Sequence, residues 1–223
     1  KLESFLYENK TFLKSEGSLK KDIELLEKKY SNLSIKISNI RKKSAIHLKN
    51  KIEDLISYLN MEYANFEVSF NNELDESSFL NHNNQSLKIF NNGFDIIEFL
   101  LCSNPGGLLK PLVTVASGGE VSRIMLAIKS VFNEVDPIQC LVFDEIDTGI
   151  SGSTAEKVGK QLKLLSSNKQ IICITHLPQI ALLASNHLHV SKIVENKSTI
   201  VKAKYLSKSQ SEEIISDLTM VKG

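Results

Sequence analysis

Apolar residues near the start of the chain recur at alternating spacings of four and three. They are Leu19, Ile23, Leu26, Tyr30, Leu33, Ile37 and Ile40. This pattern is the heptad seam of a coiled coil and predicts a long helix over residues 18–60. Because Gly17 interrupts the earlier apolar pattern, we expect a separate short helix over residues 1–14. An isolated helix would leave the seam exposed, so we also expect a partner helix from another segment or another chain.

After residue 60 the pattern changes to short apolar runs, typical of strands, that alternate with helical periods. The expected strands are 64–70, 94–102, 139–143, 170–174, 187–194 and 198–205, and the expected helices are 119–133, 154–166, 178–185 and 209–218. The polar, Asn-rich stretch 71–85 is expected to be a loop or a poorly structured insertion. Alternating strands and helices predict an α/β fold with a largely parallel sheet. The chain therefore divides into an arm, 1–60, and an α/β lobe, 61–223.

The composition is that of a globular protein, since 42% hydrophobic residues are enough for a buried core. No run of about 18 apolar residues occurs, and the lysine-rich start lacks the apolar centre of a secretion signal. We therefore expect no membrane span and a cytoplasmic location. Cys102, Cys140 and Cys173 lie in apolar runs without metal-ligand spacing, which predicts buried, reduced thiols.

The net charge of +1 hides a difference between the two parts of the chain. Residues 1–60 carry 13 Lys and Arg against 8 Asp and Glu, whereas the remainder carries 14 against 18. A basic arm can contact an anionic polymer, and it can equally be a solvated helix face. Both interpretations stay open from composition alone.

Ser117, Gly118, Gly119 and Glu120 form a Ser-x-x-Glu pattern ahead of an amphipathic helical stretch. One interpretation is a capping box, in which the serine and glutamate side chains satisfy backbone N–H groups. A second is a phosphate site, because two glycines leave N–H groups uncovered at the positive end of a helix. The tetrapeptide alone does not decide between a cap and a phosphate site.

Two carboxylates directly follow the apolar strand 141–143. Asp144 and Glu145 would lie at the carboxyl end of a buried strand, where open α/β sheets bind their ligands. Adjacent strand residues point to opposite sides, so one can hold Mg²⁺ while the other orients and deprotonates an attacking water. His176 follows the buried strand 170–174 and is expected at the same sheet edge. From there its ring can reach a phosphate or the attacking water.

These motifs, in this order, resemble the head of ABC-type ATPases. Residues 116–120 are similar to the signature motif, 141–145 to the Walker B strand, 146–149 to the D-loop and 175–176 to the switch histidine. A coiled-coil arm before the signature lobe resembles the SMC-like branch of these ATPases. The ATPase subunit of a transporter also has the signature and Walker B motifs, but it lacks such an arm.

Several longer sequence segments are similar to those of the RecN family of bacterial double-strand-break repair proteins. They are residues 104–106, 109–112, 115–123, 143–152 and 174–181. The resemblance is specific across about 61–206, whereas 211–223 departs from the basic, apolar helix expected there. It implies an ATPase of DNA repair and recombination in the DNA-damage (SOS) response, located in the cytoplasm with the nucleoid. The alternative is a chromosome-organising SMC-type ATPase.

The resemblance also implies cofactors, partners and residue roles. The sequence has no Gly-x-x-x-x-Gly-Lys-Ser/Thr loop, so the chain is expected to be the carboxyl-terminal half of such a protein and inactive alone. Its expected partners are an amino-terminal Walker A lobe, a second head and DNA, and its cofactors are ATP and Mg²⁺. The resemblance implies that Asp144 is the metal ligand and that Glu145 and His176 are catalytic. It implies that Asp147 links the two sites across the dimer. The residues implied to face a partner head's ATP are Ser117, Gly118, Gly119 and Glu120.

Overall fold

The computed structural model describes residues 2–103, 106–114, 118–195 and 198–220 of the chain. These residues group into two compact units, one made of 1–49 and 67–100 and the other of 50–66 and 101–223. The boundaries between the units fall inside regular elements, namely helix α1 (Leu2–Tyr58) and strands β1 (Asn65–Asn71) and β4 (Ile96–Cys102).

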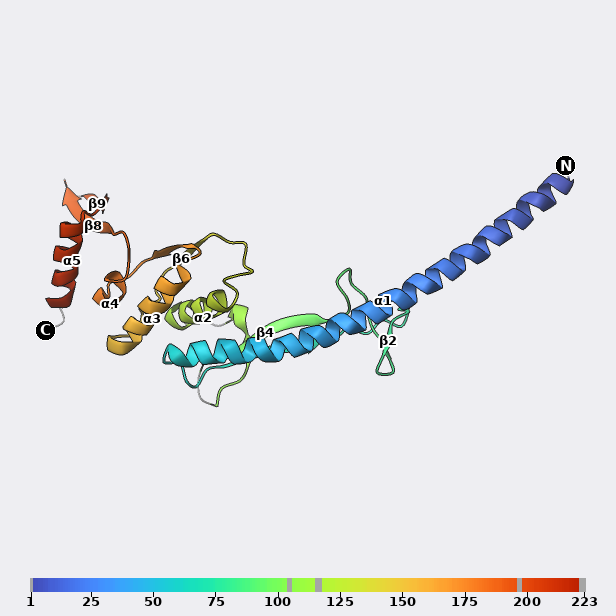
Figure 1. The fold of residues 1–223 in the computed structure, drawn as a ribbon, viewed down its shortest axis with the longest axis horizontal. Helices are drawn as coiled ribbons and strands as arrows, with labels where there is room; N and C mark the ends of the chain where they lie inside the picture. Colours follow the sequence, from blue (N-terminus) through green and yellow to red (C-terminus); the bar gives the residue numbers. More distant parts are fainter. Residues whose placement is uncertain (1, 104–105, 115–117, 196–197, 221–223) are drawn as a thin grey trace. The chain divides into compact units, whose positions relative to one another are not determined.

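Helix α1 runs without interruption past Gly17 (Figure 1). The predicted break at this glycine is therefore wrong. A glycine inside a helix costs only about 0.5–1 kcal/mol relative to alanine, and one such residue does not end a helix of this length. Glu16 and Lys20 form an ion pair of 2.8 Å across the same turn, which supports the helix there.

The predicted seam of α1 is exposed in this chain except at Tyr30, which is half-buried. Its exposed residues include Leu19, Ile23, Leu26, Leu33, Ile37 and Ile40. The face that carries Ser34 and Ser38 is covered instead, and both serines are buried. The helix thus has one covered face and one exposed apolar stripe. The partner helix expected from the heptad pattern stays a prediction.

Residues 67–100 supply the covering layer of the first unit. Strands β2 (Asn81–His82) and β3 (Gln85–Ser86) pair antiparallel, and β2 lies beside α1 (Figure 1). A hydrophobic cluster joins this layer to the helix. Its buried members are Leu80, Leu87 and Phe94, with Tyr30, Ile35 and Ile89 packed against them. Residues 71–85 are mostly loop and turn, as one of the two alternatives predicted, and the alternative of a poorly structured insertion is wrong.

A buried polar contact holds the same layer to α1. The carboxylate of Asp95, with its side chain 1% exposed, accepts hydrogen bonds from Ser38 Oγ at 2.8 Å and Arg41 Nη1 at 3.1 Å. Arg41 Nη2 also donates to the carbonyl of Asn92 at 2.9 Å. These contacts fix where the segment meets the helix, since a buried carboxylate requires its partners.

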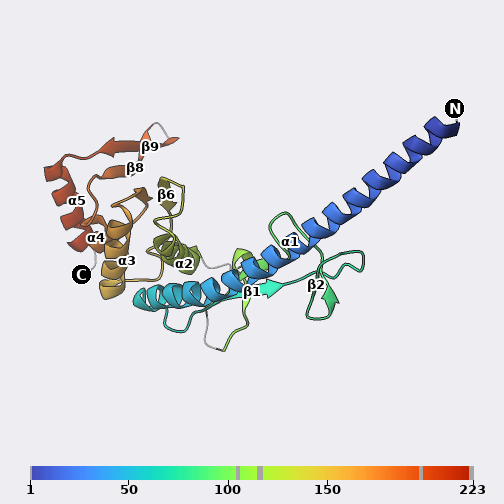
Figure 2. The same ribbon diagram turned by 45° about the vertical axis from the view of Figure 1, so that its right-hand side comes forward.

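The second unit contains the α/β part of the chain. After strand β5 (Lys110–Pro111) and a 3-10 turn η1 (Leu112–Thr114), its elements are α2 (Gly118–Val131), β6 (Cys140–Phe143), α3 (Gly152–Leu165), β7 (Gln170–Cys173), α4 (Pro178–Ala181), β8 (Leu188–Glu195), β9 (Ser198–Tyr205) and α5 (Lys208–Met220). Helix α3 contacts α2 and α4, and α4 contacts α5 (Figure 2). None of the described helices is long and apolar enough to cross a membrane.

Strands β6 and β7 pair in parallel, with Leu141 opposite Ile171 and Phe143 opposite Cys173. Strands β8 and β9 form an antiparallel hairpin, and β1, β4 and β5 lie in that order in a three-stranded sheet. The α/β class is confirmed. The parallel pair β6–β7 positions the predicted site, because both strands end at the same edge.

Candidate functional site

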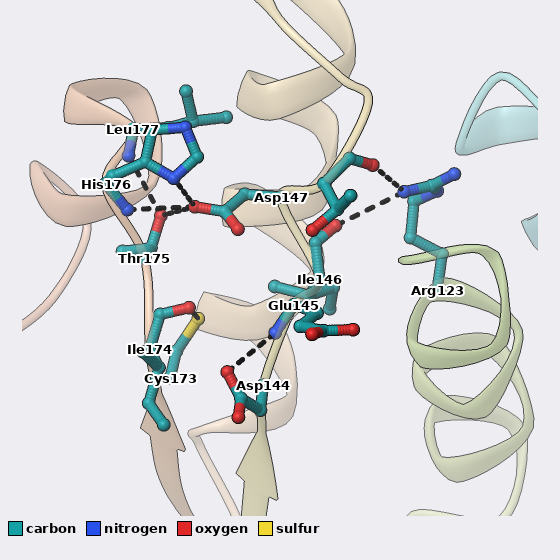
Figure 3. A network of polar contacts seen from close by, with 11 residues as sticks. Arg123, Asp144, Glu145, Ile146, Asp147, Cys173, Ile174, Thr175, His176 and Leu177 are labelled. Carbon is teal, nitrogen blue, oxygen red and sulfur yellow. Dashed lines mark hydrogen bonds and ion pairs between the residues drawn. The ribbon is translucent and has the colours of Figure 1, made fainter. Parts of the chain in front are cut away.

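The carboxyl ends of β6 and β7 bring the predicted acidic and histidine residues together. Asp144 and Glu145 follow β6, and His176 comes shortly after β7. The strands stay paired up to this edge, since the N–H of Ile174 donates to the carbonyl of Phe143 at 2.9 Å. The predicted common edge is therefore present (Figure 3).

Asp144 and Glu145 point in different directions from the end of β6 (Figure 3). Asp144 is exposed, and its Oδ1 accepts the N–H of Glu145 at 2.9 Å, while its carbonyl accepts Ser122 Oγ at 2.8 Å. Glu145 has a φ of 57°, in the left-handed region that non-glycine residues rarely adopt. This turn separates the two carboxylates, so they are placed for different tasks.

The Glu145 carboxylate lies over Gly118 at the start of α2. A Cβ atom added to Gly118 would lie 2.0 Å from Glu145 Oε2. The Glu145 carboxylate can therefore occupy this position because Gly118 has no side chain. Negative charge is favourable near the first turn of a helix.

Gly119 brings α2 equally close to the loop after β6. A Cβ atom there would lie 2.8 Å from the carbonyl oxygen of Thr148. Arg123, one turn further along α2, donates from Nη1 to Thr148 O at 3.0 Å and to Ile146 O at 3.4 Å. Gly119 and Arg123 thus join α2 to the loop 145–149, and Figure 3 shows the two hydrogen bonds of Arg123.

Arg123 is a functional candidate that the sequence interpretation missed. Its side chain is buried, and burial lowers the pKa of its guanidinium while Glu120 acts in the opposite direction. Among the described residues its Nε has no hydrogen-bond partner. One feature of the sequence could have indicated this role: Arg123 comes four positions after Gly119 and therefore lies on the same face of the helix.

Asp147 and His176 contact each other within this chain. Asp147 Oδ2 accepts hydrogen bonds from Thr175 Oγ1 at 2.6 Å and from the N–H of His176 at 2.9 Å, and it lies 3.0 Å from His176 Nδ1. The Asp147 side chain is 5% exposed and that of His176 69% exposed. The buried Asp147 carboxylate thus contacts the backbone N–H and the Nδ1 atom of a histidine whose ring is largely exposed.

The cysteines differ from their predicted state. Cys102 is buried as expected, whereas Cys140 is exposed and Cys173 half-buried. Burial, together with the smaller effect of the Asp147 and Asp144 carboxylates, raises the pKa of Cys173 to about 12. The prediction of a buried thiol is wrong for Cys140, because this residue lies on a face of β6 that the described chain leaves open.

Ser117, and Ala116 before it, lie outside the described residues, whereas Gly118, Gly119 and Glu120 form the first turn of α2. Within the described chain, no group of three or more His, Cys, Asp or Glu side chains is placed to hold a metal. Two exposed carboxylates, Asp144 and Glu145, lie at the sheet edge. That fits Mg²⁺, which keeps several waters and takes one or two carboxylates together with nucleotide phosphates.

Comparison with known proteins gives the relationship. No family model matches the chain. It is 36% identical over 197 residues to the DNA repair protein RecN of Bacillus subtilis, an alignment that covers 86% of this chain and 34% of that protein. The RecN of Haemophilus influenzae is 40% identical over 170 residues, covering 76% of this chain and 28% of the relative. The chain belongs to the RecN family. It spans about a third of the length of the RecN proteins it matches.

The fold agrees with this relationship. The Smc head domain with a coiled coil and joint from Pyrococcus yayanosii superposes with a TM-score of 0.51 at 17% sequence identity, covering 81% of this chain and 30% of the other. The α/β lobe with its long helix is therefore the fold of an SMC-type head.

Proposed function

We propose that this chain is the signature and Walker B lobe of a RecN-type ATPase that acts in DNA double-strand-break repair and recombination. The observation that carries the proposal is the gathering of Asp144, Glu145 and His176 at one sheet edge, beside the glycines of α2. Two such heads would dimerise around ATP, and hydrolysis would release them. This cycle would let the protein hold or tether DNA ends.

Each residue at the edge has a chemical task in this proposal. Asp144 would hold Mg²⁺, which neutralises phosphate charge when bound. Glu145 would orient the attacking water and accept its proton, and the exposed ring of His176 would contact the γ-phosphate. Ser117, Gly118, Gly119 and Glu120 would present the start of α2 to the ATP of a second head.

The phosphate loop would come from an amino-terminal lobe of the same protein. In support, one face of the β6–β7 pair is apolar and exposed: Val142 is 62% exposed, Ile172 47% and Ile174 56%. Alternation places these side chains opposite the buried Leu141 and Phe143. A second lobe that packs on this face would remove it from water and complete the nucleotide site.

The exposed seam of α1 would pair with the outgoing arm helix of the longer protein. The net positive charge of residues 1–60 favours contact between the arm and DNA. We place the protein in the cytoplasm, associated with the nucleoid. A chromosome-organising SMC-type ATPase is the second candidate, favoured by the arm and the head fold, whereas similarity to RecN favours repair.

The test is ATP hydrolysis by this chain with and without the amino-terminal lobe. We expect negligible turnover by the chain alone and measurable turnover, assayed with and without DNA, once the lobe is added. Glu145→Gln should lower kcat by about 10²- to 10⁴-fold, the usual contribution of a positioned general base. Measurable turnover by the chain alone, abolished by Glu145→Gln, would overturn the shared-site proposal.

A matched control is Glu134→Gln. Glu134 is exposed and lies beyond the end of α2 opposite to Gly118. The helix between them has 14 residues and so spans about 20 Å. This substitution removes the same charge far from the sheet edge, so kcat should not change.

A further inference from the structure

We propose that Asp147 is a positioning residue for His176 of its own chain, and that it fixes which ring nitrogen faces the nucleotide. The inference rests on the proposed ATPase function for the identity of the ligand, but not for the geometry. It also replaces the expected role of Asp147 as a link between two heads.

The burial of Asp147 argues against a contact across a head dimer. A residue that links two chains must be accessible, and this side chain is 5% exposed. One of its carboxylate oxygens already receives Thr175 Oγ1, the His176 N–H and His176 Nδ1, at 2.6, 2.9 and 3.0 Å. Turning this buried side chain outward to reach a second chain would break these three contacts.

The chemistry of the pair fixes the tautomer. An ionised carboxylate only accepts hydrogen bonds, so the nitrogen that it contacts, Nδ1, carries the hydrogen. Nε2 is then the nitrogen on the opposite side of a ring that is 69% exposed. In Figure 3 the ring projects from the Asp147 carboxylate away from β6 and β7. Asp147 thereby presents Nε2 as the group available to a phosphate or a water.

The loop that carries Asp147 is fixed from its other side by α2. Arg123 Nη1 donates to the carbonyls of Ile146 and Thr148, the two neighbours of Asp147 in sequence. The position of His176 is thus tied through Asp147 and Arg123 to the helix that starts with the signature glycines. This connection runs entirely through described contacts of one chain.

The tautomer is tested by NMR on the ¹⁵N-histidine-labelled chain, without nucleotide, at a pH above the titration of the rings. His176 should show protonated Nδ1 and bare Nε2. Asp147→Ala should shift the ring toward protonated Nε2. Asp147→Asn keeps the shape of the side chain and an acceptor for the backbone N–H of His176. It should shift the tautomer equilibrium in the same direction as Asp147→Ala, but less far. A wild-type His176 with protonated Nε2, or one unaffected by both substitutions, would overturn the proposal.

A second histidine and further variants serve as controls for the measurement. His187 Nε2 lies 2.9 Å from the carbonyl of Ala181, which only accepts, so this ring should show protonated Nε2 in every variant. Asp136→Asn changes another carboxylate with little exposure, 2.7 Å from Lys129, and should leave His176 unchanged. Thr175→Ser keeps the hydroxyl and should leave the tautomer of His176 unchanged. Thr175→Val removes the hydroxyl and should lower the fraction of His176 with protonated Nδ1.

The functional readout uses the complete ATPase that contains this chain. Asp147→Ala should lower kcat on the order of 100-fold, as expected for a misplaced reacting group, with a smaller change in KM for ATP. An unchanged kcat in an active wild-type background would overturn the positioning role. Absence of turnover in the wild type would instead count against the proposed ATPase function, while the NMR result stands by itself.

Discussion

Gly118 and Gly119 are adjacent residues that face different kinds of atoms, and the difference predicts different responses to alanine. At Gly119 the added methyl would lie 2.8 Å from a backbone carbonyl, Thr148 O, which cannot move alone. At Gly118 it would meet the end of a flexible side chain, Glu145. Gly119→Ala should therefore destabilise the chain by about 1–3 kcal/mol, as overpacking does, whereas Gly118→Ala should cost less than about 1 kcal/mol.

Urea unfolding of both variants measures this difference. The midpoint should fall for Gly119→Ala at an unchanged slope, which identifies a change in stability and not in the surface exposed on unfolding. Gly118→Ala should instead move the Glu145 carboxylate. Equal midpoints for the two variants would contradict the close approach of α2 to Thr148.

At this scale the sequence predicted positions better than contacts. Asp144, Glu145 and His176 were predicted from one rule, that polar residues after parallel strands meet at one edge. The same rule does not reveal that Asp147 binds His176, or that Arg123 holds the loop. Burial and hydrogen-bond partners depend on how α2 and the loop pack, and no local pattern encodes that packing.

At the scale of elements, prediction succeeded where the hydrophobic period was strong. Strands β6 and β7 and helices α2 and α3 begin and end within two residues of their predicted bounds. It failed at Gly17, where the helix propensity of the flanking residues outweighed one glycine. Over 71–85 the loop alternative was right, but the polar composition did not reveal the packing of this segment. The apolar residues that order this segment pack on α1, far away in the sequence.

The contact between Asp95 and α1 should account for much of the order in residues 67–100. Asp95→Ala leaves Ser38 and the 27%-exposed Arg41 without their buried partner. Breaking a buried pair costs about 3–5 kcal/mol, and the partial exposure of Arg41 places this variant near the lower value. Amide hydrogen exchange should accelerate across 67–100 while the second unit keeps its protection.

The matched control for Asp95 is an exposed ion pair in the same segment. Glu73 Oε2 lies 2.7 Å from Lys88 Nζ, and both side chains are about half exposed. Solvent screens such a pair, so Glu73→Gln should leave hydrogen exchange unchanged. If both variants accelerated exchange equally, the buried contact would not be what orders the segment.

At the scale of the whole molecule, the described residues leave apolar surface open along the seam of α1 and on one face of β6–β7. Soluble monomers seldom leave contiguous apolar surface in water, so both surfaces indicate contact with further protein. The alignment with the RecN of Bacillus subtilis covers 34% of that protein. In the proposed function, the seam would pair with an arm helix, and the sheet face would be covered by an amino-terminal lobe.

Cys140 reports directly on the second of these contacts. It lies on β6 on the same face as Val142 and is exposed, so iodoacetamide at pH 8 should alkylate it readily in the chain alone. Adding the amino-terminal lobe should slow the reaction strongly, because the lobe would cover this face. Cys173, whose pKa is raised to about 12, stays a neutral thiol and should react slowly in both states. Mass spectrometry resolves the two sites, and an unchanged rate at Cys140 in the active assembly would show that the lobe binds elsewhere.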